Sequence, residues 1–183
     1  MPDALHDALS GFKSEFTEAG FLPFEFKSWE ADDVIASLAV KAAYNGLKVT
    51  VVSTDKGFFQ LADSRIQILN YFDRKLYTLE EINQRYGVEV KQLIDLWGLT
   101  GDTTNHLPGV AGIGIKTATD LLQHYGDLDT LLVHKDDPAL KNKVKNALNT
   151  DWQNALLSRK LIKLVTDLRL GVNLHQMRLK TVN

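Results

Sequence analysis

The chain has 183 residues, of which 44% are hydrophobic and only four are proline, so it can fold around a full core and is not a disordered segment. It has no cysteine, which excludes disulfides and thiolate metal sites and agrees with a cytoplasmic protein. Residues 1–134 carry a charge of −8 and residues 135–183 a charge of +6, whereas a passive DNA-binding module would be basic throughout.

This division of charge suits a protein that holds cations in one place and a polyanion in another. For the basic tail alone, a solvated helix face is the alternative. The first twenty residues are amphipathic and acidic, unlike a signal peptide, and no apolar run approaches membrane-spanning length. We therefore expect no membrane partner.

Helix and strand patterns alternate over the first hundred residues. The spacing of apolar residues predicts helices over 3–19, 29–45 and 58–61, and a capping box at Thr78–Glu81 begins a further helix that ends at Gly87. Strands are predicted over 21–26, where Pro23 indicates a sheet edge, and over 47–53, 66–69 and 75–77. The nearly continuous apolar run 47–53 is typical of a parallel strand covered on both faces.

From residue 90 onward the patterns predict only helices, over 90–97, 117–125, 128–134, 138–148 and 151–164. The fold class is therefore α/β, with a small parallel or mixed sheet and flanking helices, followed by an all-helical region. We expect an α/β part over residues 1–88 and a helical part over residues 89–183.

A glycine-rich segment, Leu107–Ala118, lies between two of the predicted helices. Its three glycines permit a sharp turn and leave consecutive N–H groups before a helix N-terminus, which is a combination that attracts phosphate. Lys116 adds a positive charge there. A P-loop is excluded because Ile115 precedes the lysine, and a dinucleotide fingerprint is excluded by the glycine order. A tight helix connection with glycine caps is the structural alternative.

Five acidic residues are candidates for a metal site: Glu30, Asp32, Asp33, Asp55 and Asp102. Three of them open one helix, and Asp55 follows a strand end, where ligands collect in open α/β sheets. Carboxylates meeting there would repel one another unless a hard cation lay between them, and oxygen ligands favour Mg²⁺ or Mn²⁺. Helix capping and turn formation are the alternative roles of these residues.

Four ordered motifs carry a resemblance to a known family: Glu30–Asp33, Ser53–Lys56, Leu99–Asp102 and Leu107–Ala118. Their order and spacing resemble those of the 5′-nuclease family, which includes the 5′–3′ exonuclease domain of DNA polymerase I and the flap endonucleases. The amino-acid sequence around these motifs is most similar to that of the stand-alone bacterial flap endonucleases of the exonuclease IX type. The resemblance implies a PIN-like nuclease core and a helix-hairpin-helix region at about residues 98–126.

The resemblance also implies a Mg²⁺- or Mn²⁺-dependent, monomeric nuclease that hydrolyses DNA at 5′ flaps. The implied metal ligands are Glu30 and Asp32 at a first ion and Asp55 and Asp102 at a second, with Asp33 in support. The implied DNA-binding residues are Gly112, Ile113, Gly114, Ile115, Lys116 and Thr117. A hairpin K⁺ ion is implied at Leu99, Thr100, Pro108, Val110 and Ile113. We expect Gly114 to adopt a positive φ.

The chain departs from the family pattern at three places. Gly57 and Asn105 stand where the family has further acids, so we expect a depleted second metal site. The pattern's opening strands and arch, roughly seventy residues, precede the point where this chain starts. We therefore expect an N-terminally incomplete core, through fragmentation or a misassigned start, and slow or absent cleavage by this chain alone. A catalytically inactive helix-hairpin-helix module that binds DNA is the competing hypothesis.

Overall fold

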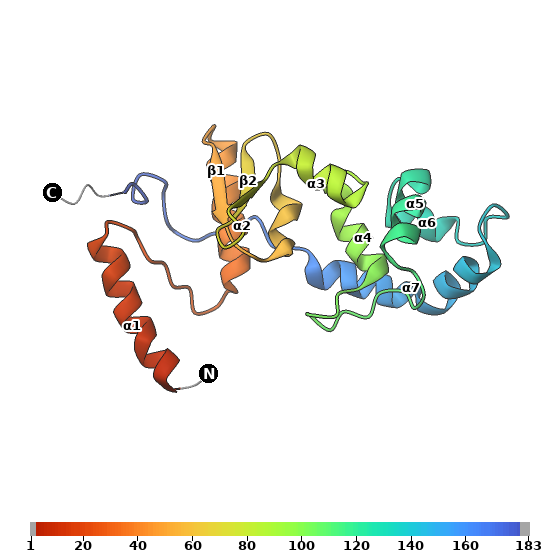
Figure 1. Cartoon of the computed structure of the whole chain (residues 1–183), viewed down its shortest axis with the longest axis horizontal. Helices are drawn as coiled ribbons and strands as arrows, with labels where there is room; N and C mark the ends of the chain where they lie inside the picture. Colours follow the sequence, from red (N-terminus) through yellow and green to blue (C-terminus); the bar gives the residue numbers. More distant parts are fainter. Residues whose placement is uncertain (1–2, 180–183) are drawn as a thin grey trace.

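The structure is a computed structural model that describes residues 3–179, without the side chains of residues 3–7, 9 and 10. A three-stranded sheet with its helices occupies one part of the elongated molecule, and a purely helical part adjoins it (Figure 1). The elements of the first part are α1 (Asp3–Glu18), α2 (Ala31–Tyr44), β1 (Val49–Val52), the 3-10 helix η1 (Lys56–Leu61), β2 (Ile66–Asn70), β3 (Lys75–Tyr77) and α3 (Leu79–Tyr86). Those of the second are the 3-10 helix η2 (Val90–Gln92), α4 (Leu93–Thr100), α5 (Ile115–Tyr125), α6 (Leu128–Val133) and α7 (Asn142–Ile162).

The sheet has the order β1-β2-β3, and its topology is mixed as the sequence predicts. β1 pairs in parallel with β2, with Val51 opposite Ile68, and β2 pairs antiparallel with β3. One face packs against α2, where Ala36 and Ala39 are small enough to let helix and strands approach closely. Since β1 and β2 run the same way, their carboxyl ends lie at one edge of the sheet.

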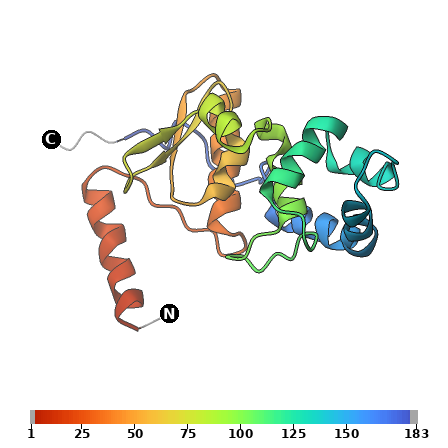
Figure 2. The same ribbon diagram turned by 45° about the vertical axis from the view of Figure 1, so that its right-hand side comes forward.

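Two expectations for the α/β part are wrong. β1 is not covered on both faces, because the Val52 side chain is 61% exposed and Thr50 is exposed as well. Residues 21–26 form no strand: within residues 3–179 they pair with no other strand, although the chain is extended there. They connect to α1, which stands apart from the rest of the α/β part (Figure 2) and leaves Phe12 and Phe16 about half exposed.

The helical part is built around the packing of α4 on α7. Gly98 makes the close approach possible, because a Cβ there would lie 3.0 Å from the Ala155 carbonyl oxygen and 3.0 Å from the Arg159 Cβ. The expected separate helices over 138–148 and 151–164 form one continuous helix, α7. The polar residues between them do not break it, and the Thr150 hydroxyl bonds within the helix to the Asn146 carbonyl four residues earlier.

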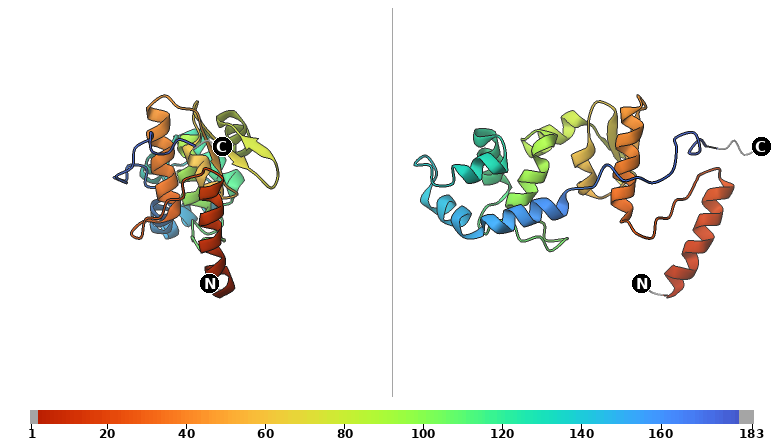
Figure 3. Two further views of the ribbon diagram at one scale, coloured as in Figure 1. Left: turned by 90° about the vertical axis from the view of Figure 1, so that its left-hand side faces the viewer. Right: turned by 180° about the vertical axis from the view of Figure 1, so that it is seen from behind.

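After α7 the chain returns to the α/β part as an extended segment, residues 163–172, which we call the C-terminal strap. It crosses α2 on the side seen in the right-hand view of Figure 3. Three α2 side chains at four-residue spacing hold it: the Asp33 carboxylate, the Ser37 hydroxyl and the Lys41 ammonium each bond to strap backbone groups. The strap therefore joins the two parts of the molecule a second time.

No helix between residues 3 and 179 combines the length and the apolar character needed to span a bilayer.

Candidate metal centre and nucleic-acid interface

Four of the five candidate carboxylates come from two neighbouring elements. Glu30 is the N-cap residue of α2 but makes no side-chain capping bond, and Asp32 and Asp33 lie in the first turn. Asp55 follows β1 and caps η1. The α2 N-terminus and the carboxyl ends of β1 and β2 face the same, lower side of the molecule in Figure 1.

The pKa of the Asp32 carboxyl is raised, first by partial burial and then by the negative charges of Asp55, Glu30 and Asp33. No ion pair within residues 3–179 neutralises any of these four carboxylates. An ionised Asp32 therefore opposes folding, because the folded state binds its proton more tightly than the unfolded state does. Concentrated negative charge without a counter-ion is typical of a cation site.

The individual carboxylates are partly engaged in local structure. Asp55 Oδ1 accepts the Gly57 N–H at 2.7 Å, which leaves its second oxygen free. Asp33 Oδ1 accepts the Val165 N–H at 2.8 Å and so anchors the strap. A Cβ at Gly57 would lie 3.2 Å from Asp55 Oδ1, so this glycine leaves Asp55 more room than the expected acid would.

Asp102 comes from a different segment of the chain, the turn that follows α4. Its Oδ1 accepts the Thr104 N–H at 2.8 Å and its Oδ2 accepts the Asn105 side-chain amide at 3.2 Å, so both oxygens take part in an Asx-type turn. Between residues 3 and 179, no three acidic or histidine side chains form a set that could hold a metal ion directly. The negative charges of Glu30, Asp33 and Asp55 thus act together on the Asp32 carboxyl, and Asp102 is not among the charges that raise its pKa.

The connection between α4 and α5 crosses itself at two glycines. Gly101 and Gly109 have φ values of +68° and +59°, and a Cβ on Gly109 would lie 2.3 Å from the Gly101 nitrogen. The Val110 N–H donates to the Leu99 carbonyl at 2.8 Å, and the Ile113 N–H donates to the Val110 carbonyl at 3.1 Å. The positions expected to hold K⁺ (Leu99, Thr100, Pro108, Val110 and Ile113) therefore lie on two crossing segments and the turn that follows them.

The N-terminus of α5 presents free donors. Among the described residues, the N–H groups of Ile115, Lys116 and Thr117 have no protein acceptor, and the N-cap Gly114 supplies no side-chain cap. Gly114 and Lys116 are exposed, as phosphate binding requires, whereas the Ile113 side chain is buried.

The expected positive φ at Gly114 is wrong. Its φ is −90° and its ψ is 176°, which any residue can adopt, and a Cβ there would meet nothing within 4 Å. The residue that needs the left-handed region in this turn is Gly112, with φ +82°. Gly114 instead leaves open space directly before the helix.

Two α7 side chains that the sequence analysis missed hold the hairpin in place. The fully buried Ser158 hydroxyl accepts the Gly109 N–H at 3.1 Å, and Asp151 Oδ2 accepts the Ala111 N–H at 3.1 Å. The two residues lie seven positions apart and so share one face of α7. Spacing alone could have placed them together, but no local pattern indicates what they contact.

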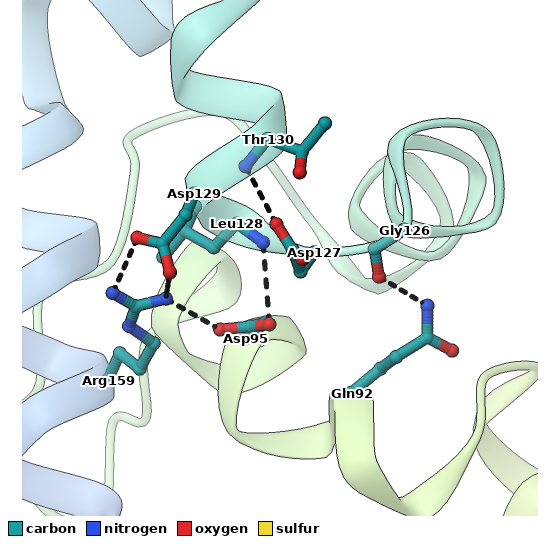
Figure 4. A network of polar contacts seen from close by, with 8 residues as sticks. All are labelled: Gln92, Asp95, Gly126, Asp127, Leu128, Asp129, Thr130 and Arg159. Atoms are coloured by element: carbon teal, nitrogen blue, oxygen red, sulfur yellow. Dashed lines mark hydrogen bonds and ion pairs between the residues drawn. The ribbon is translucent and has the colours of Figure 1, made fainter.

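A polar network centred on Arg159 links α4 and α6 to α7 (Figure 4). Its guanidinium bonds to Asp95 at 3.1 Å and to Asp129 at 2.8 and 2.9 Å, and Asp95 also accepts the Leu128 N–H at 3.4 Å. Burial raises the pKa of the Asp95 carboxyl, while Arg159 and the Leu128 N–H act in the opposite direction. Beside the network, Gln92 bonds to the carbonyls of Leu122 and Gly126.

Comparison with known proteins identifies the family. The model described as the 5′-3′ exonuclease N-terminal resolvase-like domain matches residues 1–87, and that of the 5′-3′ exonuclease C-terminal SAM fold matches residues 88–183. The flap endonuclease Xni of Pseudoalteromonas translucida is 40% identical over 179 residues, which are 98% of this chain and 68% of the relative. The flap endonuclease Xni of Colwellia psychrerythraea is 43% identical over 181 residues, 99% of this chain and 61% of the relative.

Solved structures show the same fold. A variant of the phage T5 5′-exonuclease has a TM-score of 0.72 and 25% identity, and the match covers 83% of this chain and 62% of that one. The catalytic core of Rad2 in complex with DNA substrate has a TM-score of 0.57 and 16% identity, covering 91% and 57% of the two chains. The chain thus spans about three fifths of these solved chains. Taken with the two family models, which together match its whole length, these similarities show that the chain belongs to the 5′-3′ exonuclease family.

Proposed function

We propose that this chain acts as a metal-dependent nuclease of the flap endonuclease type, which hydrolyses phosphodiester bonds of DNA at 5′ flaps. One observation carries the proposal: the same chain presents carboxylates without counter-ions at a sheet edge and a hairpin with free N–H donors. The α/β part, residues 1–88, would supply the chemistry, and residues 89–183 would bind the duplex. The Xni relatives are named flap endonucleases, which agrees with this division.

The side chains at the sheet edge suit a hard divalent cation such as Mg²⁺ or Mn²⁺, because all the metal-ligating atoms that they offer are carboxylate oxygens. Asp32, Glu30 and Asp55 would hold it, largely through water molecules, since no three of the described acids form a direct ligand set. Asp102 would contribute a further carboxylate whose oxygens also accept hydrogen bonds within its turn, and Asp33 supports the site through the strap. Such a cation would activate water and stabilise the leaving oxygen. A phage T5 5′-exonuclease structure holds divalent metal ions.

The hairpin would bind the DNA backbone without reading sequence. Its donors are main-chain N–H groups at Gly112, Gly114, Ile115, Lys116 and Thr117, and such donors contact phosphate whatever the base. Ile113 is buried and shapes the turn, while the Lys116 ammonium adds charge. The carbonyls of Leu99, Thr100, Pro108, Val110 and Ile113 are the proposed K⁺ ligands, and a K⁺ ion there would bring a second positive charge to the phosphate.

A cleavage assay on a labelled 5′-flap duplex tests this proposal. The chain is expected to cut slowly near the junction in Mg²⁺ or Mn²⁺ and not in EDTA, and Asp32→Asn is expected to lower this slow rate at least about 100-fold. Removal of that charge relieves repulsion, so the variant should fold as well as the wild type does.

Asp63→Asn is the matched control. Asp63 is an aspartate too, but it lies in the loop before β2 and accepts the Arg65 and Ile66 N–H groups at the start of β2, which lies at the opposite edge of the sheet from Asp55. Its rate should stay close to that of the wild type. Tight DNA binding without cleavage in either metal would contradict the nuclease proposal and favour the inactive binding module.

A further inference from the structure

The side chain of Gln60 joins the two parts of the molecule at one point. Its Nε2 donates to the Gly57 carbonyl at 2.8 Å and to the Ile162 carbonyl at 3.0 Å, and its Oε1 accepts the Leu164 N–H at 3.0 Å. Gln60 is partly buried, and its amide bonds to η1 on one side and to the end of α7 on the other. Neither the motifs nor the family resemblance indicates this residue.

On the η1 side, Gln60 leads directly to a candidate metal ligand. The residue Gly57 is held on both sides of its Cα, because its carbonyl accepts from Gln60 and its N–H donates to Asp55 Oδ1 at 2.7 Å. A displacement of Gln60 therefore moves the residue whose N–H orients the Asp55 carboxylate.

On the α7 side, Gln60 leads to the hairpin. Ile162 lies one helical turn, about 6 Å, beyond Ser158, and the buried Ser158 hydroxyl accepts the Gly109 N–H. The strap runs parallel to this route: Val165, three residues after Ile162, donates to Asp33, and its carbonyl accepts from the Ser37 hydroxyl at 3.1 Å. Continuous hydrogen-bonded contacts thus run from the hairpin to both acid-bearing elements.

We propose that Gln60 is a positioning residue that couples DNA binding at the hairpin to the position of the carboxylates at the sheet edge. The inference rests on the proposed nuclease function, since a phosphate fixed by the hairpin must meet the carboxylates within a few tenths of an ångström to react. Gln60 fixes the position of Asp55 relative to α7, and the strap fixes the position of α2 relative to α7. DNA binding at the hairpin then stiffens η1 through these contacts.

Hydrogen exchange with and without a 5′-flap duplex in EDTA measures this coupling independently of cleavage. In the wild type, DNA is expected to slow the exchange of the Phe58–Leu61 amides about threefold or more. In Gln60→Met, which keeps the length of the side chain and removes its hydrogen bonds, that slowing is expected to vanish while DNA affinity stays within about twofold. Gln67→Met is the matched control, because among residues 3–179 the Gln67 side-chain amide bonds to the Thr50 hydroxyl within the sheet and to nothing else.

A second variant guards against loss of folding. Gln60→Glu keeps the acceptor for Leu164 and loses both donors, so it should also lose the DNA-dependent slowing. The inference would be overturned if DNA slowed amide exchange equally in the wild type and in either folded variant. It would also be overturned if the wild type bound DNA with no slowing of amide exchange at residues 58–61. A wild type that shows the coupling but does not cleave would refute the nuclease proposal alone, and one that does not bind DNA would refute both.

Discussion

Gly109→Ala is expected to lower the midpoint of thermal unfolding by about 10 °C or more and to abolish duplex binding, because one methyl group has no space at the hairpin crossing. The new Cβ would lie 2.3 Å from the Gly101 nitrogen and 2.6 Å from the Thr100 carbonyl carbon, at a φ of +59°. Neither segment can retreat easily, since Val110 bonds to Leu99 and Gly109 itself bonds to the buried Ser158 hydroxyl. The cost combines backbone strain with loss of these bonds, about 4 kcal/mol or more.

Gly114→Ala is the matched control in the same loop. At a φ of −90° with open space around the Cβ position, it should unfold within a few degrees of the wild type. It should nevertheless weaken duplex binding, because its methyl group occupies the space before the α5 donors. Circular dichroism melts and fluorescence anisotropy with a duplex measure the two effects. An unchanged melting midpoint in Gly109→Ala would show that the crossing is not a fixed part of the fold.

Arg159→Met is expected to destabilise the chain by about 3–5 kcal/mol, because it leaves the Asp95 carboxylate buried without its charged partner. The Asp95 pKa, already raised by burial, should rise further in the variant. The folded state then holds the proton more tightly than the unfolded state, so folding is favoured at low pH and stability is lost as pH rises through the raised pKa. The free energy of unfolding of Arg159→Met should therefore fall further below that of the wild type at pH 8 than at pH 5.

The double variant Asp95→Asn/Arg159→Met serves as the control. It removes both charges, while the Asn oxygen can still accept the Leu128 N–H, so it should recover much of the lost stability. The exposed Asp129 loses an ion pair in both variants and contributes little to the difference. Urea unfolding at the two pH values provides the measurement. A loss of unfolding free energy in Arg159→Met that is below 1 kcal/mol and does not change with pH would contradict the role assigned to the Asp95–Arg159 pair.

Local sequence signals predicted the elements that depend on local physics. The Thr78–Glu81 capping box is present in full, Gly87 ends α3 in the left-handed conformation, and Asp127 caps α6. Apolar spacing located α2 and all three strands of the sheet to within a few residues. The deciding hydrogen bonds of the caps lie within about four residues of one another, and the helix and strands are visible in the local spacing of their apolar residues.

The remaining features depend on contacts that sequence spacing cannot supply. Arg159 meets Asp95 from 64 residues away, and Gln60 meets Ile162 from 102 residues away. The φ of Gly114 is ordinary because Gly112, two residues earlier, makes the turn. Residues 21–26 have the composition of a strand, but a strand also requires a neighbouring strand to pair with.

If the hairpin places a DNA junction beside the carboxylate edge of the sheet, a metal ion bound at that edge should cut the bound DNA at the junction. Fe²⁺ added with peroxide to the complex with a 5′-flap duplex produces short-lived oxidants at the cation site, which break the nearest sugars whether or not hydrolysis occurs. We expect breaks confined to a few nucleotides around the flap junction in the wild type and in Asp63→Asn, and their loss in Asp32→Asn at equal DNA occupancy. Breaks spread evenly along the duplex, or an unchanged pattern in Asp32→Asn, would contradict this arrangement of hairpin and carboxylates.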